Sequence, residues 1–195
     1  MVLFDKIFKQ GIKPKNEDRN LPSFWADDYC QIEIVLRTNI EQIKKSIKQI
    51  DEFTKKTRTE YGFTDIFMRE NLPYPTINEE LQTDYFESLL IEKGFEKAKK
   101  IRYNGHTIIN CTKTTSNACS LPCFNFFYDC NNEFINNIWI STSLINSNDH
   151  FNKILEALYE LGKNCELVLI NWNSLELIDL TDRNQIKEYL MSYWK

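Results

Sequence analysis

Four strand patterns follow one another in the middle of the sequence with no helical pattern between them, and this run constrains the fold most. Parallel strands need a crossover of about a dozen or more residues, usually a helix, whereas antiparallel strands need only a turn. The missing helix therefore predicts an antiparallel meander. The four patterns cover residues 101–103, 107–109, 124–128 and 134–143.

The first two of these patterns flank Asn104-Gly105. Both residue types accept the positive φ angles of a tight turn, so the dipeptide predicts a β-hairpin. The next segment, 111–121, is polar and is expected to be a loop.

A first helix is expected over about residues 39–57. Thr38 and Glu41 have the spacing of a capping box, in which each side chain bonds a free backbone amide of the first turn. The apolar stripe at helical spacing comprises Ile40, Ile43, Ile47, Ile50 and Phe53.

Three more helices are expected. The second begins at Asn78 and ends near Gly94. The third covers 148–161 and is stopped by Gly162, and the fourth is capped by Asp182 with Gln185. The inward residues of the second helix are expected to be Leu81, Tyr85, Leu89 and Leu90.

Four further strands complete the expected order. Residues 31–37 alternate as in a half-buried strand, and 63–69 follow as a second strand. The apolar run 167–170 is typical of a central strand covered on both faces, and 175–180 form another strand. The fold class is therefore α+β, with a mostly antiparallel sheet of about seven or eight strands and about four helices mainly on one face.

The domain organisation follows from the first twenty residues. Leu3, Phe4, Ile7 and Phe8 fall on one face of a short helix, and a polar stretch leads to Pro22. We expect an N-terminal amphipathic appendage and linker over 1–20, and a single α+β domain over 21–195. No signal-peptide pattern or membrane-spanning run is present, so a cytoplasmic protein with no membrane partner is expected.

Charge narrows the classes of partner. The chain has 24 Lys and Arg against 28 Asp and Glu, a net charge of −4. Nucleic-acid binding depends on a strongly basic surface, so a nucleic-acid partner is not expected. The acidic stretch 131–182 is either ordinary solvated surface or a face that docks a basic protein partner, for which complementary charge would speed association.

The candidate catalytic and metal-binding residues are scattered. Structural zinc sites use closely spaced ligand pairs, and only Cys119 and Cys123 lie close together. Either His106 or His150 could approach a cysteine, but no local motif surrounds one. We therefore predict no catalytic residue, no cofactor and no metal ligand, although whether the cluster Cys111, Cys119, Cys123 and Cys130 binds a metal stays open.

Two acidic pairs and two tryptophans are the remaining candidates. Asp179 and Asp182 flank Thr181, and Asp182 is already expected to cap a helix. Trp139 lies in a strand pattern and Trp172 at the end of one, and both are expected in the core. The predicted partner-binding residues are Trp25, Asp27, Asp28 and Trp194, which lie near the edges of the domain.

Two segments, Phe24 to Cys30 and Leu169 to Leu180, resemble small bacterial α+β proteins of uncharacterised families, including immunity proteins of polymorphic toxin systems. This resemblance implies a cytosolic protein that binds and blocks a toxin, and it carries over no functional residue. The predicted function is a non-enzymatic protein-binding module, and the resemblance implies that this module is an immunity-type inhibitor of a toxin. Two alternatives stay open: an enzyme of unfamiliar type that uses Cys, His or Asp, and a regulatory domain that binds a small ligand.

Overall fold

The computed structural model describes residues 21–68, 77, 81–131 and 133–195. The expected appendage over 1–20 and the expected helix start at Asn78 lie outside the described residues. None of the described helices is both long enough and apolar enough to span a membrane.

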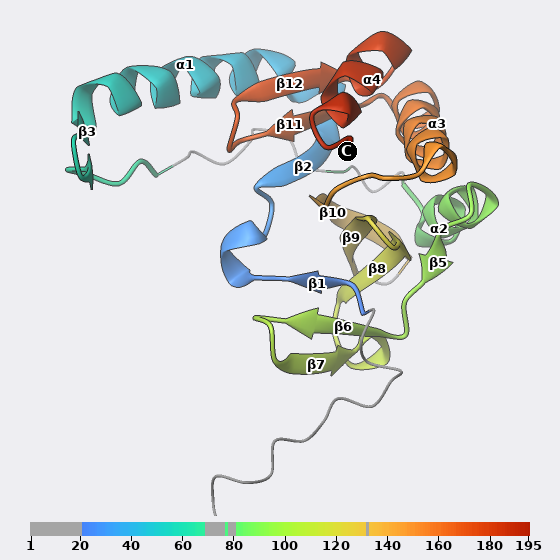
Figure 1. The fold of residues 1–195 in the computed structure, drawn as a ribbon. Helices are drawn as coiled ribbons and strands as arrows, with labels where there is room; N and C mark the ends of the chain where they lie inside the picture. Colours follow the sequence, from blue (N-terminus) through green and yellow to red (C-terminus); the bar gives the residue numbers. More distant parts are fainter. Residues whose placement is uncertain (1–20, 69–76, 78–80, 132) are drawn as a thin grey trace, which may run out of the picture.

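A seven-stranded sheet forms the centre of the described fold (Figure 1). Its strands lie in the order β12-β11-β2-β10-β9-β8-β5, and every neighbouring pair is antiparallel. The α+β class with a mostly antiparallel sheet is confirmed. The strands are β2 (Ile32–Leu36), β5 (Glu96–Lys97), β8 (Ser116–Leu121), β9 (Phe124–Asn131), β10 (Phe134–Thr142), β11 (Leu167–Asn171) and β12 (Glu176–Asp179).

Two smaller sheets accompany the large one. The first pairs β1 (Ser23–Phe24) in parallel with β6 (Lys100–Tyr103), which forms a hairpin with β7 (Thr107–Asn110). The second is a hairpin of β3 (Arg58–Thr59) and β4 (Gly62–Phe63). The turn between β6 and β7 confirms the Asn-Gly prediction, because Asn104 and Gly105 both have positive φ angles, 48° and 74°.

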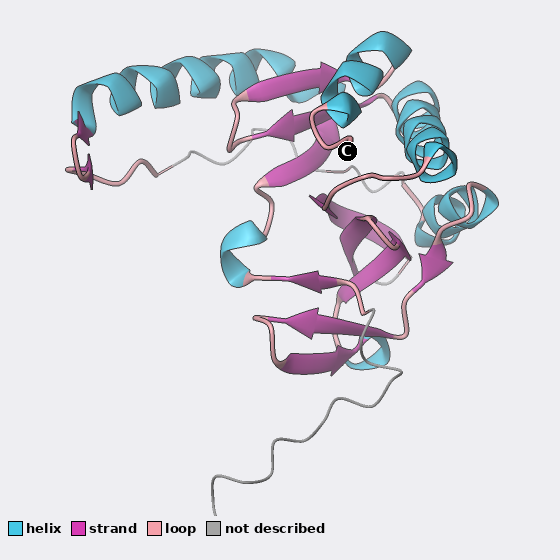
Figure 2. Cartoon of the chain, in the orientation of Figure 1, coloured by secondary structure: helices cyan, strands magenta, loops and turns pink. Residues whose placement is uncertain are grey.

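Three of the four α-helices in the described residues cover one face of the large sheet (Figures 1 and 2). They are α2 (Thr83–Glu92), α3 (Asn148–Cys165) and α4 (Arg183–Met191). The opposite face is shared: α1 (Ile40–Thr57) covers β2, β11 and β12, and the small β1-β6-β7 sheet covers β8, β9 and β10. Short 3₁₀ turns occur as η2 (Ala26–Asp28), η3 (Arg37–Asn39) and η4 (Cys111–Lys113).

Strand β11 shows why both faces need a cover. Successive side chains of a strand point to opposite faces. Leu167 and Leu169 join the core under the three helices, whereas Val168 and Ile170 pack under α1. All five β11 residues are buried, which confirms the predicted central strand.

Two expected elements between the first helix and β9 were wrong. Of the strand expected over 63–69, only Phe63 lies in a strand, the two-residue β4, which pairs with β3 and not with the large sheet; residue 69 lies outside the described residues. The polar loop expected over 111–121 contains the strand β8. Its buried residues are the small Ala118 and Cys119 together with Leu121, so its pattern is weak on a hydrophobicity scale.

The capping box predicted at Thr38 and Glu41 is not formed. A 3₁₀ turn precedes α1, so Asn39 occupies the N-cap position and its side chain makes no capping bond. Glu41 instead bonds Lys44, one turn along the helix. By contrast, Asp182 caps α4 as predicted, because its carboxylate accepts hydrogen bonds from the backbone N–H groups of Asn184 and Gln185.

Two details of the helices also differ from expectation. Gly162 does not stop the third helix, which continues to Cys165. A Cβ atom at Gly162 would lie 2.3 Å from the backbone carbon of Leu180, so glycine allows close packing there. In α2 the buried aromatic residue is Phe86, whereas Tyr85 is 44% exposed.

Candidate functional site

Helix α1 carries an arm that extends from the sheet. The buried side of the helix packs through Ile43 on Val35 and Val168 of β2 and β11. Figure 1 shows that the far end of α1 extends beyond these strands and carries the β3–β4 hairpin at its tip. We call residues 58–68 the arm.

The arm exposes large apolar side chains. Tyr61 is 93% exposed, Phe63 60%, Ile66 81% and Met68 84%, within eight consecutive residues. Single exposed apolar residues are normal on a protein surface, but a contiguous group of them marks an interaction site. The arm is therefore the strongest candidate for a binding surface among the described residues.

Local contacts hold the arm against the end of α1. The backbone N–H of Thr64 donates to the carbonyl of Thr57 at 3.0 Å. The rings of Phe53 and Phe67 pack edge to face with centroids 5.4 Å apart. The apolar side chains at the tip are thus presented by an anchored backbone, which lowers the conformational entropy lost when a partner binds.

The predicted partner-binding residues Trp25, Asp27 and Asp28 lie together in and beside η2. All three are exposed, Trp25 by 57%. The indole of Trp25 lies over Gly105, where an added Cβ would meet the ring at 2.9 Å. The carboxylate of Asp28 accepts a hydrogen bond from the backbone N–H of Trp25. Trp25 and Asp28 therefore also stabilise the contact between η2 and the β6–β7 turn.

The fourth predicted residue, Trp194, lies elsewhere. Its ring packs edge to face on Phe151 of α3, with centroids 5.5 Å apart, and it forms an isolated bridge with Ile145. It is half-buried at the edge of the main core. As expected, Trp139 and Trp172 are buried, at 0% and 7% exposure.

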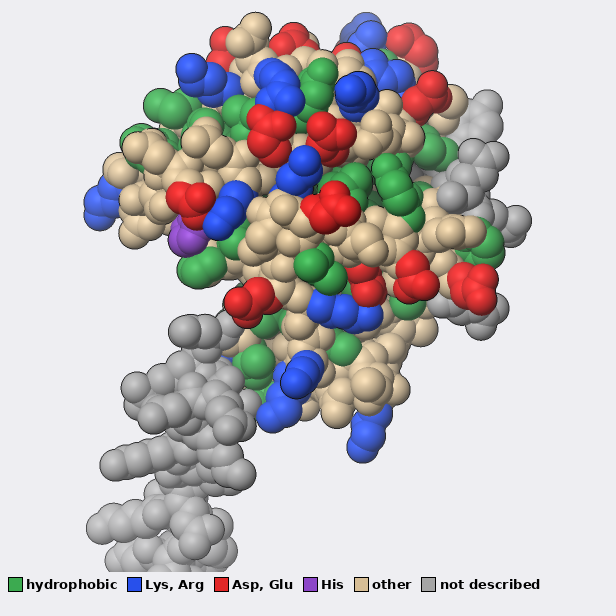
Figure 3. Space-filling view, turned by 90° about the vertical axis from the view of Figure 1, so that its right-hand side faces the viewer, with side chains coloured by type: hydrophobic (Ala, Val, Ile, Leu, Met, Phe, Trp, Pro, Cys, Tyr) green, Lys and Arg blue, Asp and Glu red, His purple; other side chains and the backbone are tan. Residues whose placement is uncertain are grey.

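The acidic stretch 131–182 is partly neutralised by ion pairs. Asp149 pairs with Lys153, Glu156 with Arg183, and Asp179 with Arg37. Figure 3 shows acidic and basic side chains interspersed over the face that carries α2, α3 and α4. A continuous acidic surface for a basic partner is not visible on this face.

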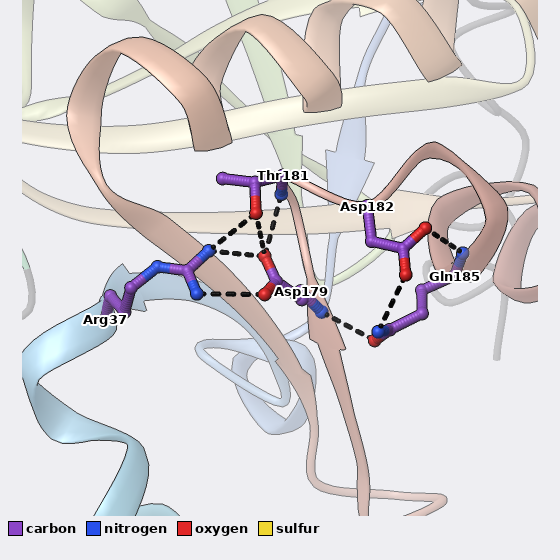
Figure 4. Close-up of polar contacts among 5 residues, drawn as sticks. All are labelled: Arg37, Asp179, Thr181, Asp182 and Gln185. Atoms are coloured by element: carbon purple, nitrogen blue, oxygen red, sulfur yellow. Dashed lines mark hydrogen bonds and ion pairs between the residues drawn. The ribbon is translucent and has the colours of Figure 1, made fainter.

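A polar network surrounds Asp179 (Figure 4). Both guanidinium nitrogens of Arg37 donate to its carboxylate, and Thr181 donates to the same group through its N–H and its hydroxyl. The bonds from Arg37 hold the pKa of Asp179 well below its ordinary range. A carboxylate bonded in this way is ionised and has little capacity left to act as an acid, a base or a metal ligand.

Cys123 and His150 form the closest approach to a catalytic pair. The Cys123 Sγ lies 3.8 Å from the His150 Nδ1. A cysteine nucleophile needs a lowered thiol pKa, and burial raises the pKa of Cys123. Within the described residues, His150 also has no carboxylate partner that would orient it as a base. The contact is better explained as packing at the start of α3.

The thiols are not gathered into a metal site within the part of the chain that the structure describes. All six cysteines are free, and among the described residues no three His, Cys, Asp or Glu side chains are placed to hold a metal ion. Burial raises the pKa of Cys119 to about 12. This thiol is protonated at neutral pH and is a poor ligand.

A buried network under α2 has a structural explanation. Glu87 is 8% exposed, accepts a hydrogen bond from the Tyr128 hydroxyl at 2.5 Å, and pairs with Lys97 at 2.5 Å. Burial and the neighbouring acidic groups raise the pKa of Tyr128, so its hydroxyl stays a donor. The network satisfies a buried carboxylate between α2, β5 and β9.

Comparison with known proteins gives no relative for this chain, because no family model, no curated protein and no solved structure matches it. Its function is therefore inferred from its own residues.

The sequence predicts a strand over 63–69, and this prediction does not indicate that the apolar residues of the arm are exposed. A signal for the hairpin was present: only Glu60 and Tyr61 separate β3 from Gly62, which has a φ of 138°. Short connections with glycine are typical of hairpins.

Proposed function

We propose that this chain is a non-enzymatic protein-binding module that acts as an inhibitor of the immunity type, and that the arm inserts into its partner. One observation carries the proposal: Tyr61, Phe63, Ile66 and Met68 are exposed together on an anchored projection. Aromatic residues and methionine are enriched in the buried centres of protein interfaces. A projecting apolar arm fits a partner with a concave apolar groove, and a groove of this kind is a site that an inhibitor can block.

The arm suits a protein partner better than a small molecule. Small-molecule sites are concave, whereas the arm projects from the sheet and exposes Tyr61, Phe63, Ile66 and Met68. The arm also carries charges of both signs, including Arg58, Glu60 and Asp65, which are all exposed. Mixed charge around an apolar centre is the usual anatomy of a protein interface.

The chemistry of the other clusters favours a non-enzymatic role. The thiol of Cys123 has a raised pKa, and the carboxylate of Asp179 is held by Arg37. Neither group is placed as the activated nucleophile or base that catalysis requires.

Site-specific photo-crosslinking tests this proposal. A benzoylphenylalanine residue in place of Tyr61 should crosslink one protein in the native cell, and the same residue in place of Lys113, which is also exposed, should not. The crosslinked protein is then purified, and it should form a stoichiometric complex with the unmodified chain and lose its activity in that complex.

A crosslinker in place of Trp25 tests whether the partner binds at η2, where three of the partner-binding residues predicted from the sequence lie, or at the arm. Crosslinking at Trp25 but not at Tyr61 would move the interface to η2. A purified partner that keeps its full activity in the complex would contradict the inhibitor role.

A further inference from the structure

A cavity of about 250 Å³ lies between the β6–β7 hairpin and the large sheet, away from the arm. It opens beside the hydrophobic cluster between the β1-β6-β7 sheet and the large sheet, which contains Phe24, Ile101 and Trp139. The lining residues come from the strands β1, β6, β7 and β8 and from the positions directly after η2 and η4, and they are Phe24, Tyr29, Ile101, Tyr103, Ile109, Thr114 and Ser116.

Three of the seven lining side chains, Phe24, Tyr29 and Tyr103, are aromatic. The rings of Phe24 and Tyr103 lie 5.3 Å apart, and Phe24 is in turn supported by Phe127 and Trp139 behind it. Tyr29 stacks at a tilt on Trp139 at 4.7 Å. The three lining rings are therefore held in place by their aromatic neighbours.

At one end of the cavity, the carboxylate of Asp129 is bonded to two of the lining side chains. The hydroxyl groups of two lining residues, Ser116 and Tyr29, donate to Asp129 at 2.5 and 2.8 Å. Asn137 donates to the Tyr29 hydroxyl at 3.0 Å and fixes its direction. An ionised carboxylate can accept about four hydrogen bonds, so these two donors do not exhaust Asp129.

The basic side chains of β6 do not extend into the cavity, so they do not neutralise the negative charge of Asp129 there. Lys100 and Arg102 alternate with the lining residues Ile101 and Tyr103, so they point to the other face of β6. Lys113 precedes the lining residue Thr114 and is exposed to solvent, where its charge is screened.

We propose that this cavity binds a small organic ammonium ion with an aromatic body. A cation in the cavity lies beside the rings of Phe24, Tyr29 and Tyr103, where it can be attracted by the negative potential over a ring face, and Asp129 attracts it by charge. The volume suits a single aromatic ring with a short side chain. This site is independent of the arm and of the proposed inhibitor function.

The test compares 2-phenylethylammonium with its neutral counterpart 2-phenylethanol by calorimetry or NMR titration. The ammonium compound should bind at least about tenfold more tightly to the wild-type chain. In Asp129→Asn the ratio of the two dissociation constants should fall to about one, because the substitution removes the charge and keeps the side-chain volume. The control Asp149→Asn, which removes an exposed carboxylate at the start of α3, should keep the preference.

A second variant locates the site. Ile109→Trp fills the cavity and keeps Asp129, so it should abolish binding of both compounds. The proposal is overturned if neither compound binds saturably, if Asp129→Asn keeps the preference, or if Ile109→Trp still binds the ammonium compound. Should Asp129→Asn fail to fold, the Ile109→Trp result alone decides.

Discussion

The guanidinium of Arg37 donates two hydrogen bonds to the carboxylate of Asp179, which lies 142 residues later in the chain. Arg37 follows β2 and Asp179 ends β12, so the pair joins two strands that β11 separates. Thr181 donates to the same carboxylate through its N–H at 2.8 Å and its hydroxyl at 2.7 Å. The pair therefore connects the start of α1 to the segment before α4.

Removal of this charge should destabilise the fold modestly. Both side chains are about one-third exposed, 33% and 32%, so water screens the pair and Asp179→Asn should cost only about 1 kcal/mol. Urea denaturation measures this change. The control Lys55→Met breaks the exposed pair with Asp51 and should leave the free energy of unfolding nearly unchanged. An Asp179→Asn variant as stable as the wild type would show that the pair adds nothing.

The same pair predicts a dependence on pH. The folded pKa of Asp179 is lowered, chiefly by its hydrogen bonds from Arg37, below the value of about 3.9 typical of an unfolded chain. Its contribution is therefore present above about pH 4 and is lost as the pH falls through the folded pKa. The stability difference between wild type and Asp179→Asn should shrink between about pH 6 and pH 2.5. A difference that stays constant over this range would contradict the assignment.

Gly162→Ala should destabilise the protein although alanine favours helices. Helix propensity alone predicts a gain of about 1 kcal/mol. The added Cβ would lie 2.3 Å from backbone of Leu180, and such overpacking costs about 1–3 kcal/mol or more. Thermal and urea denaturation should show a net loss. The control is Asn164→Ala, which changes an exposed residue of the same helix and should not destabilise the protein. A Gly162→Ala variant that is more stable than the wild type would contradict the close packing of Gly162 on Leu180.

The thiols should differ in their reaction with iodoacetamide. Cys119 and Cys123 are buried, at 0% and 6% exposure, and burial raises the pKa of both thiols. They should stay unlabelled at neutral pH in the folded protein, whereas Cys111 and Cys130 are partly exposed and should react slowly. Peptide mapping by mass spectrometry checks this order, with urea-unfolded protein as the reference. Fast labelling of Cys123 would reveal an activated thiol and would favour the enzyme alternative.

The fold was predictable wherever a local pattern determined the outcome. The turn at Asn104-Gly105 depends on two residues that accept positive φ, and Asp182 caps α4 through the next three residues. The apolar run of β11 also indicated its burial on both faces. In each case the deciding interaction lies within a few residues, so it is visible in the sequence.

The errors occurred where distant residues decide the structure. Gly162 has the residue type that often ends a helix, but a glycine is needed at this position because the backbone of Leu180 packs closely against it. Thr38 has the residue type of a cap, but Arg37 is held by Asp179 and a 3₁₀ turn replaces the capping box. The residues that line the cavity are likewise separated in sequence and meet only after the sheets have packed.

The candidate site was the least predictable part. Trp25, Asp27 and Asp28 are exposed and near one another, whereas Trp194 packs on Phe151 in another part of the fold. The arm depends on β4 pairing with β3 in place of the large sheet, and an apolar pattern alone does not reveal which partner a short strand chooses.

The affinity of the purified partner for arm variants tests the central proposal most directly. In Tyr61→Ser/Phe63→Ser the arm loses two anchor side chains, and the dissociation constant should rise at least about 100-fold, equivalent to about 2.7 kcal/mol. The control Tyr85→Ser/Ile91→Ser removes two apolar side chains that are 44% and 51% exposed on α2, and it should change the affinity less than about threefold. An arm variant that binds as tightly as the wild type would contradict the proposal that this projection holds the partner.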